Sequence, residues 1–288
     1  MPKTRLSRTI LSLALAAALG LAACGGNDGP GPSVPDPDSH FNRIATFAVC
    51  EQVGSSCESD DAVNAEIVAA SSDGMTLVYT NGEKGEIGFV DITDPARPKG
   101  LGAVATGGEP TSVAVVGAYA LAAVNTSPSF VQPAGKLLVI DIARRTTVHT
   151  IDLGGQPDSV AVSRDGRYAA IVIENERDEG VNGGAIPQLP AGRLAILDIG
   201  GAPAIWKLRN VELTGIVARF GADPEPEYVA INDDNVAVVT LQENNHIALV
   251  DLATARVTGH FSAGSVTLSR VDLTDERPNQ VRFDQTQT

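Results

Sequence analysis

An internal repeat constrains the fold of this chain more than any other feature of its sequence. Each copy holds three short runs of Val, Ile, Leu and Ala, separated by Gly, Asp and Asn, and the third run ends in an apolar-Asp-apolar triplet. The triplets are Val90–Ile92, Ile140–Ile142, Leu197–Ile199 and Val250–Leu252. Their aspartates recur at intervals of about fifty residues, which is a period typical of repeat architectures.

The runs themselves are too short for helices and rich in β-branched residues, so they predict strands. The first runs are Ile67–Ala70, Val113–Val116, Val160–Val162 and Val229–Ile231; the second are Leu77–Thr80, Ala120–Val124, Ala169–Ile173 and Val236–Leu241. A fourth, less regular run precedes the next copy, as in Gly102–Thr106 and Thr147–Leu153. No window shows helical periodicity over three turns.

Four strands per repeat of about fifty residues are typical of β-propeller blades. The near-continuous apolar runs predict strands covered on both faces, as occurs when blades pack face to face. We therefore expect an all-β fold, a YVTN- or WD40-like β-propeller with about four four-stranded blades. Four blades are few for a closed ring, so we expect an incomplete ring from the N-terminal part of a larger propeller. Arg43–Val49 is expected to be an outer strand at its seam.

The start of the chain predicts export. Lys3, Arg5 and Arg8 precede an apolar segment over 10–21 that is too short to span a bilayer and typical of a secretory signal. The following Leu21-Ala22-Ala23-Cys24 resembles the lipobox of bacterial lipoproteins, which implies cleavage before Cys24 and its acylation. Gly25 in the next position implies the outer membrane, where the protein would face the periplasm or the cell surface.

The predicted organisation has four parts. Residues 1–24 form the signal peptide with its lipobox, and 25–40, rich in Gly, Pro, Asp and Ser, form a disordered tether. Residues 41–275 form the blades, and 276–288 form an irregular tail. Membrane attachment is expected through the lipid of Cys24.

The net charge limits which partners are expected, and the two remaining cysteines indicate a disulfide. The formal net charge of −14 repels nucleic acid, so no nucleic-acid partner is expected. The same charge suits cationic ligands, although solubility alone would also explain it. Cys50 and Cys57 have no nearby Cys or His partners, so in an exported chain a disulfide is favoured over a metal site.

The sequence contains no recognisable catalytic motif. No nucleophile elbow, zinc-binding His-Glu-x-x-His, phosphate-binding loop or EF-hand spacing occurs, and the catalytic residues stay unknown. The repeated aspartates are interpreted as turn caps. His246 is interpreted as part of a blade face or rim rather than a ligand, and the four histidines show no metal-ligand spacing.

A geometrical argument gives candidate binding residues. In an antiparallel blade the start of the first strand and the end of the second lie at one edge, near a mouth of the central channel. The polar residues at these positions are Glu66, Asn81, Glu109, Asn125, Asp158, Glu174, Asn175, Arg177, Glu227, Glu243 and Asn244. Oxygen ligands suit Ca²⁺, with Glu174, Glu227 and Glu243 as candidate metal ligands. Capping of turns is the plainer alternative.

The long, charged loop Glu174–Gly192 is the best binding candidate, since binding residues often lie on loops of a rigid scaffold. Two stretches, Glu174–Leu194 and Asp223–Leu252, also carry a family resemblance: they resemble the choice-of-anchor I propeller family. That family overlaps bacterial proteins named for esterase-like activity of phytase and others called alkaline phosphatases. The resemblance covers about residues 41–280, and relatives continue beyond the end of this chain.

These observations predict a membrane-anchored extracytoplasmic propeller that acts as a binding or scaffold module, with a cation at the channel mouth. The alternative, implied by the resemblance, is a divalent-cation-dependent phosphoester or ester hydrolase acting on a small phosphoester. A protein partner is the other candidate ligand for a binding module. Phosphoryl chemistry would need cationic groups, and Arg177 is the only basic residue expected near that mouth.

Overall fold

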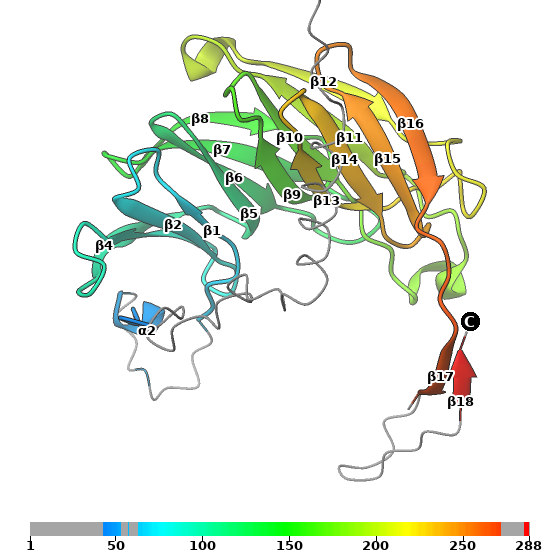
Figure 1. The fold of residues 1–288 in the computed structure, drawn as a ribbon, viewed down its shortest axis with the longest axis horizontal. Coiled ribbons are helices and arrows are strands. Elements are labelled where there is room, and N and C mark those ends of the chain that lie inside the picture. The colour runs from blue at the N-terminus through cyan, green and yellow to red at the C-terminus, as the bar shows by residue number, and fades with distance from the viewer. Residues whose placement is uncertain (1–42, 53–56, 58–62, 272–284, 288) are drawn as a thin grey trace, which may run out of the picture. The chain divides into compact units, whose positions relative to one another are not determined.

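The computed structural model describes residues 43–52, 57, 63–271 and 285–287 (Figure 1). The chain divides into two compact units, Met1–Ile44 and Ala45–Thr288, and nearly all described residues belong to the second. The predicted signal peptide, Cys24 and the tether lie outside the described residues. Within those residues, no helix is both long enough and apolar enough to cross a bilayer.

Four antiparallel four-stranded sheets follow one another along the chain (Figure 1). Blade 1 contains β1 (Val68–Ala70), β2 (Thr76–Asn81), β3 (Glu86–Asp91) and β4 (Lys99–Ala105). Blade 2 contains β5 (Glu109–Val116), β6 (Tyr119–Asn125), β7 (Gly135–Asp141) and β8 (Thr146–Asp152). Blade 3 contains β9 (Pro157–Val162), β10 (Tyr168–Ile173), β11 (Arg193–Asp198) and β12 (Lys207–Glu212). Blade 4 contains β13 (Pro226–Ile231), β14 (Val236–Leu241), β15 (His246–Asp251) and β16 (Arg256–Ser262).

The all-β propeller fold predicted from the repeat is confirmed. Each sheet pairs its strands in chain order, as propeller blades do, and β14 has the bounds predicted for its apolar run. Most other strands are longer than their apolar cores by one to four residues, because polar residues at the strand ends also join the ladders. The first strand of blade 2, for example, begins at Glu109 rather than at Val113.

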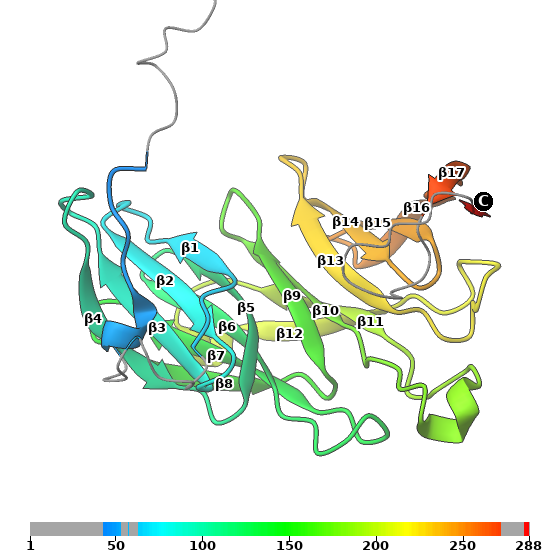
Figure 2. The ribbon, with the colours of Figure 1, turned by 90° about the horizontal axis from the view of Figure 1, so that it is seen from below.

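Apolar packing between the faces of consecutive blades forms the core. Blades 1 and 2 share a cluster around Phe89, blades 2 and 3 share one around Ile171, and blades 3 and 4 share one around Ile196. The first strands of the blades contact their neighbours in the order β1, β5, β9, β13, as Figure 2 shows. No comparable contact joins blade 4 to blade 1 among the described residues, so these four blades do not close into a ring.

The segment before blade 1 differs from the prediction. Residues 43–48 have no regular structure and Val49–Gln52 form a short helix, α2, instead of an outer strand. The side-chain amide of Gln52 donates to the Tyr79 hydroxyl at 2.9 Å and to the carbonyl of Gly102 at 3.0 Å. These hydrogen bonds fix the segment against blade 1 and take the place of strand pairing.

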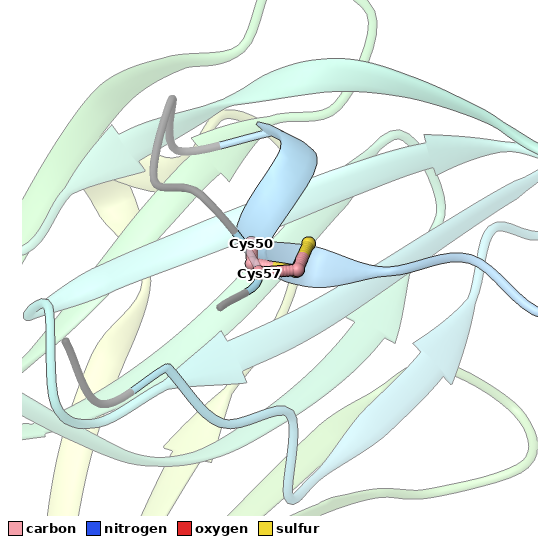
Figure 3. Close-up of a disulfide and its surroundings, with 2 residues drawn as sticks. All are labelled: Cys50 and Cys57. Atoms are coloured by element: carbon pink, nitrogen blue, oxygen red, sulfur yellow. A yellow bond between two sulfur atoms is a disulfide. The ribbon is translucent and has the colours of Figure 1, made fainter. Parts of the chain in front are cut away.

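A disulfide joins Cys50 in α2 to Cys57, with the two Cα atoms 5.2 Å apart (Figure 3). This is the pair that spacing and export predicted. The loop it closes is short, so the bond acts locally, on the segment that lies against blade 1.

Three of the four repeated aspartates cap the turn that follows their strand. Oδ1 of Asp91 accepts from the backbone N–H of Thr93 at 2.8 Å, and Asp141 and Asp251 accept in the same way from Arg144 and Thr254. Asp198 differs, because its carboxylate pairs with Arg209 on β12 at 2.8 and 2.5 Å. Hydrogen bonds from the side chains and backbone of Thr93 and Thr254 hold the pKa values of Asp91 and Asp251 below their usual range. The backbone N–H of Arg144, with its side chain, lowers the pKa of Asp141 in the same way.

The end of the chain also departs from expectation. Leu268–Val271 form β17, and Gln285–Gln287 form β18, which pairs with β17 in an antiparallel two-stranded sheet. The segment 276–288, expected to be irregular, therefore contains a short strand.

Replacing Ile196 by Ala tests the importance of packing between the blades. Ile196 is 0 % exposed in the cluster between blades 3 and 4. We expect its truncation to lower the free energy of unfolding by about 2–5 kcal/mol, through lost burial and a residual cavity. Ile205, at 66 % exposed, is the matched control, and its Ala variant should unfold almost as the parent does in urea. Equal losses for the two variants would contradict the proposed core.

Candidate functional site

An acidic cavity of about 500 Å³ lies where the loop of blade 3 meets the polar edge of blade 4. It is formed by the loop between β10 and β11, the start of β13 and the turn between β14 and β15. Its lining residues are Glu174, Glu176, Arg177, Asp178, Glu179, Gly184, Ile186, Gln188, Glu225, Glu227, Gln242 and Glu243. Four of the predicted mouth residues, Glu174, Arg177, Glu227 and Glu243, are thus brought together.

Arg177 fixes the loop to blade 4. Its guanidinium lies 3.1 Å from a carboxylate oxygen of Asp223 and 2.8 Å from one of Glu225, and it also donates to the backbone carbonyl of Asp223. Its backbone N–H donates to the other oxygen of Glu225 at 2.8 Å. The side chains of Arg177, Asp223 and Glu225 are 11, 3 and 6 % exposed, so the three charges are buried together.

Hydrogen bonds within the loop complete its conformation. The side chain of Gln188 accepts from the N–H of Asp178 at 3.0 Å and donates to the carbonyl of Asp178 at 2.9 Å. The N–H of Gln188 donates to Asp223 at 2.8 Å. The loop also holds a short 3₁₀ turn, η2 (Val181–Gly184), and two cis peptide bonds, before Pro187 and Pro190. The hydrogen bonds of Gln188 hold the backbone of the loop that carries these carboxylates.

Burial and mutual repulsion raise the pKa values of several carboxyl groups in and beside the cavity. Burial, reinforced by Asp158 and other acidic neighbours, raises the pKa of Glu174 to about 8. Burial, with Glu227 and Glu176 nearby, raises the pKa of Asp158 to about 6. The pKa values of Glu225 and Glu227 are also raised, mainly by burial. Arg177, the basic residue of the lining, is already paired with Asp223 and Glu225, so no unpaired cation of the lining offsets the charge of the other carboxyl groups.

The blade 4 side of the cavity carries Glu227 and Glu243. With the amide of Gln242 oriented to satisfy both groups, its nitrogen donates to the two carboxylate oxygens of Glu227 at 3.0 and 3.1 Å. Glu227 is thereby held at the start of β13, facing the loop of blade 3. Glu243, in the exposed turn after β14, lies at the same edge as predicted for antiparallel neighbours.

The asparagines predicted at the mouth have a different role. Oδ1 of Asn175 accepts from the N–H of Gln156 at 2.9 Å, while its amide donates to the carbonyls of Pro190 and Ala191. Asn244 bonds in the same manner to the N–H of Glu225 and to the carbonyl of Asp223. Both side chains are buried and hold the backbone through these hydrogen bonds, so their role in the structure is structural and they do not face a ligand as predicted.

Asn81 follows the same pattern in blade 1. It is 1 % exposed, and its Oδ1 accepts from the N–H of Asn64 at 3.3 Å. Oδ1 of Asn125 in blade 2 accepts from the N–H of Ser127 at 2.9 Å. Glu66 and Glu109 are exposed near the first strands of blades 1 and 2, and none of these four residues lines the acidic cavity. The expected single cluster around a channel is thus confined to blades 3 and 4.

The predicted calcium ligands are close together without forming a metal centre. Glu174, Glu227 and Glu243 line one cavity. Within the part of the chain that the structure describes, however, no three His, Cys, Asp or Glu residues are grouped so that they could hold a metal ion. These carboxylates are spread around the cavity, whereas a calcium ion needs oxygen ligands that converge on one point.

Two residues central to this site were absent from the sequence prediction. Asp223 and Glu225 lie just before β13, where both pair with Arg177, and Glu225 also lines the cavity. The spacing of two acidic residues around Pro224 was visible in the sequence. Their partner was not, because Arg177 is 46 and 48 residues away in the chain.

Comparisons with known proteins identify the sequence family. The profile of the choice-of-anchor I domain matches residues 66–214 and 203–285, which together make up most of the chain. The comparison with curated protein sequences gave no match.

Solved structures with related folds include hydrazine synthase of Kuenenia stuttgartiensis (14 % identity, TM-score 0.40, 66 % of this chain and 65 % of that one). The WD40 domain of Neurospora crassa Pan2 (12 %, 0.47, 68 and 52 %) and the periplasmic gluconolactonase of Pseudomonas aeruginosa (16 %, 0.47, 69 and 53 %) are further examples. The chain spans between half and two thirds of the length of these structures.

Substituting Glu174 by Gln tests the charge state of the cavity. A carboxyl group whose pKa rises to about 8 in the folded state binds a proton there that the unfolded chain has lost, so stability falls as pH rises from about 4.5 to 8. The neutral Gln avoids this loss. We therefore expect the variant to gain roughly 1–3 kcal/mol relative to the parent between pH 5 and pH 9, a range that discounts for partial exposure. Urea unfolding at both pH values measures this, and a pH-independent difference would refute the raised pKa.

Proposed function

Because the chain belongs to the choice-of-anchor I domain family, which indicates a cell-surface or exported protein, we propose that it is an anchored propeller that binds a cationic ligand in its acidic cavity. The propeller acts here as a binding module. One observation carries the proposal: seven carboxylates line the cavity, and the only basic side chain in its lining, Arg177, is paired with one of them, Glu225, and with Asp223, which is not in the lining.

The physical argument rests on unbalanced charge. Burial disfavours the ionised form of the carboxyl groups in this site and their mutual repulsion adds to that effect, which raises the pKa values of Glu174 and Asp158. A cation in the cavity would relieve the same repulsion. Ligand binding and proton release are therefore coupled, and affinity should rise with pH until Glu174 has lost its proton.

The spread of the carboxylates favours an organic cation over a single metal ion. An ammonium or guanidinium group on a flexible ligand can contact Glu174 in the loop and Glu227 or Glu243 on blade 4. A calcium ion instead needs six to eight oxygens at about 2.3–2.6 Å, and the described carboxylates do not converge in that way. Calcium is thus the less favoured of the two cation classes.

The hydrolase alternative has weaker support. A phosphoester is an anion, and the acidic lining of the cavity repels it. The guanidinium of Arg177, the cation expected to assist phosphoryl chemistry, is already bonded to Asp223 and Glu225. The proposed function therefore involves binding without turnover of a phosphoester.

Spermidine titration tests the proposed binding site. Calorimetry on the Cys24→Ser chain should show one saturable site for spermidine, with the affinity for spermidine increasing from pH 5 to pH 9. Glu227→Gln and Glu243→Gln should each weaken binding by about three- to tenfold, which corresponds to loss of one charge-assisted contact. A parallel titration with Ca²⁺ distinguishes an organic cation from a metal ion.

The matched control is Glu66→Gln, which removes an exposed carboxylate in blade 1 outside the cavity. It should leave spermidine affinity unchanged. Equal weakening in all three variants would mean that binding reflects net charge alone, and tighter binding of Ca²⁺ than of spermidine would reverse the ranking of cation classes. Turnover of p-nitrophenyl phosphate or acetate that Glu174→Gln abolishes would favour the hydrolase instead.

The lipid anchor completes the proposed function, and its support is the lipobox-like Leu21-Ala22-Ala23-Cys24 after a signal-like segment. An acylated Cys24 would hold the propeller at the outer membrane through the tether of residues 25–40.

Replacing Cys24 by Ser tests the anchor. The parent should incorporate labelled palmitate and sediment with outer membranes, whereas the variant should lose the label and be recovered in the soluble periplasmic fraction. Cys57→Ser is a control that should keep the label. Membrane association of the Cys24 variant equal to that of the parent would disprove lipid anchoring.

A further inference from the structure

Two histidines that are 14 residues apart in sequence meet on one face of blade 4. His246 begins β15 opposite Ser262, and His260 on β16 lies opposite Ala248. Opposite residues of an antiparallel pair share a face, and so do residues two apart in a strand, so the imidazoles are diagonal neighbours. Nε2 of His246 lies 2.9 Å from Nδ1 of His260.

The two rings share one hydrogen bond and have no other side-chain partner within the described residues. One imidazole donates an N–H into the gap and the other accepts with its lone pair, so the gap has room for one proton. Neutral imidazole is the form that binds metals, through the lone pair of a ring nitrogen.

We propose that His246 and His260 form a two-histidine site for a divalent transition-metal ion, with water in the remaining coordination positions. Imidazole nitrogens bind such ions at about 2.0–2.1 Å, and two bonds of that length at a right angle separate the nitrogens by about 2.9 Å. The observed separation is 2.9 Å, so both nitrogens can bind one ion without movement of the strands. The ring that donates into the gap shifts its proton to its other nitrogen, and no net proton is lost.

Copper(II) is the preferred ion. Right-angled positions are those of a tetragonal complex, and nitrogen ligands follow an affinity order in which Cu²⁺ exceeds both Ni²⁺ and Zn²⁺. A hard ion such as Ca²⁺ prefers oxygen and should not bind this pair. The strongly negative chain also raises the local concentration of cations.

The strand pairing makes the site rigid. β15 and β16 remain paired from His246–Ser262 through Leu249–Gly259, so the Cα atoms that carry both rings are fixed by the ladder. Neither histidine lines the acidic cavity, although His246 lines a neighbouring pocket together with Glu227 and Gln242. The histidine variants described below therefore leave the lining of the acidic cavity intact.

Copper titration of the full soluble chain tests the proposal. The parent should be the Cys24→Ser form, and binding should be followed by calorimetry and by electron paramagnetic resonance. We expect one Cu²⁺ per chain at this site, a spectrum with nitrogen coordination, and weaker binding of Zn²⁺. His246→Gln and His260→Gln should each lower Cu²⁺ affinity by at least about tenfold, since one ligand of two is lost.

His149→Gln is the matched control, because His149 lies on β8 in blade 2 and should leave affinity unchanged. Any copper bound at the chain terminus is common to all variants and cancels in the comparison. Far-ultraviolet circular dichroism with thermal melts verifies that each variant folds, and Cu²⁺ should raise the melting temperature of the parent and of His149→Gln but not of the two site variants. Unchanged Cu²⁺ affinity in both single variants, or equal loss in His149→Gln, would overturn the proposal.

Discussion

Apolar packing on both faces of the blades is the constraint on which the rest of this structure depends. The middle strands of blades 2 and 3 are buried along nearly their whole length, with residues of alternating direction packing into different interblade clusters. Because a shift by one residue would exchange the side chains that fill two different, closely packed clusters, packing fixes the register and with it the positions of the strand ends. The polar loops at those ends inherit that rigidity, which is what allows a site to be built from Glu174 and Glu227 on different blades.

The buried ion pairs of Arg177 add a second level of order. Arg177, Asp223 and Glu225 connect the long loop of blade 3 to the strand start of blade 4. Taking these charges from water is costly, and their close contacts offset that cost only while all partners are present. Arg177 neutralises Asp223 and Glu225. The other carboxylates of the cavity therefore have no cation beside them, which is the basis of the proposed cation binding.

The sequence predicted the fold better than the site, for identifiable reasons. Strand positions depend on local composition, so the apolar runs and the Asp triplets located the first three strands of each blade and the fourth strands of blades 1 and 2 in outline. The site depends on which blades supply it. Glu66 occupies the same repeat position as Glu227, and Glu109 precedes a proline as Glu225 does, but only blade 3 has the long loop that lines the cavity. The pair His246 and His260 was missed because its proximity arises from strand register, which spacing alone does not show.

A buried asparagine lies at the end of the second strand in blade 1 and just after that strand in blades 3 and 4. Asn175 and Asn244 are committed to the backbone, whereas the side chains just before them, Glu174 and Glu243, line the cavity. Mutations of Glu174 and Glu243 can therefore change the lining of the cavity without removing a hydrogen bond that the asparagines make. In blades 3 and 4 this scaffold offers evolution an adjustable residue beside one that must stay fixed.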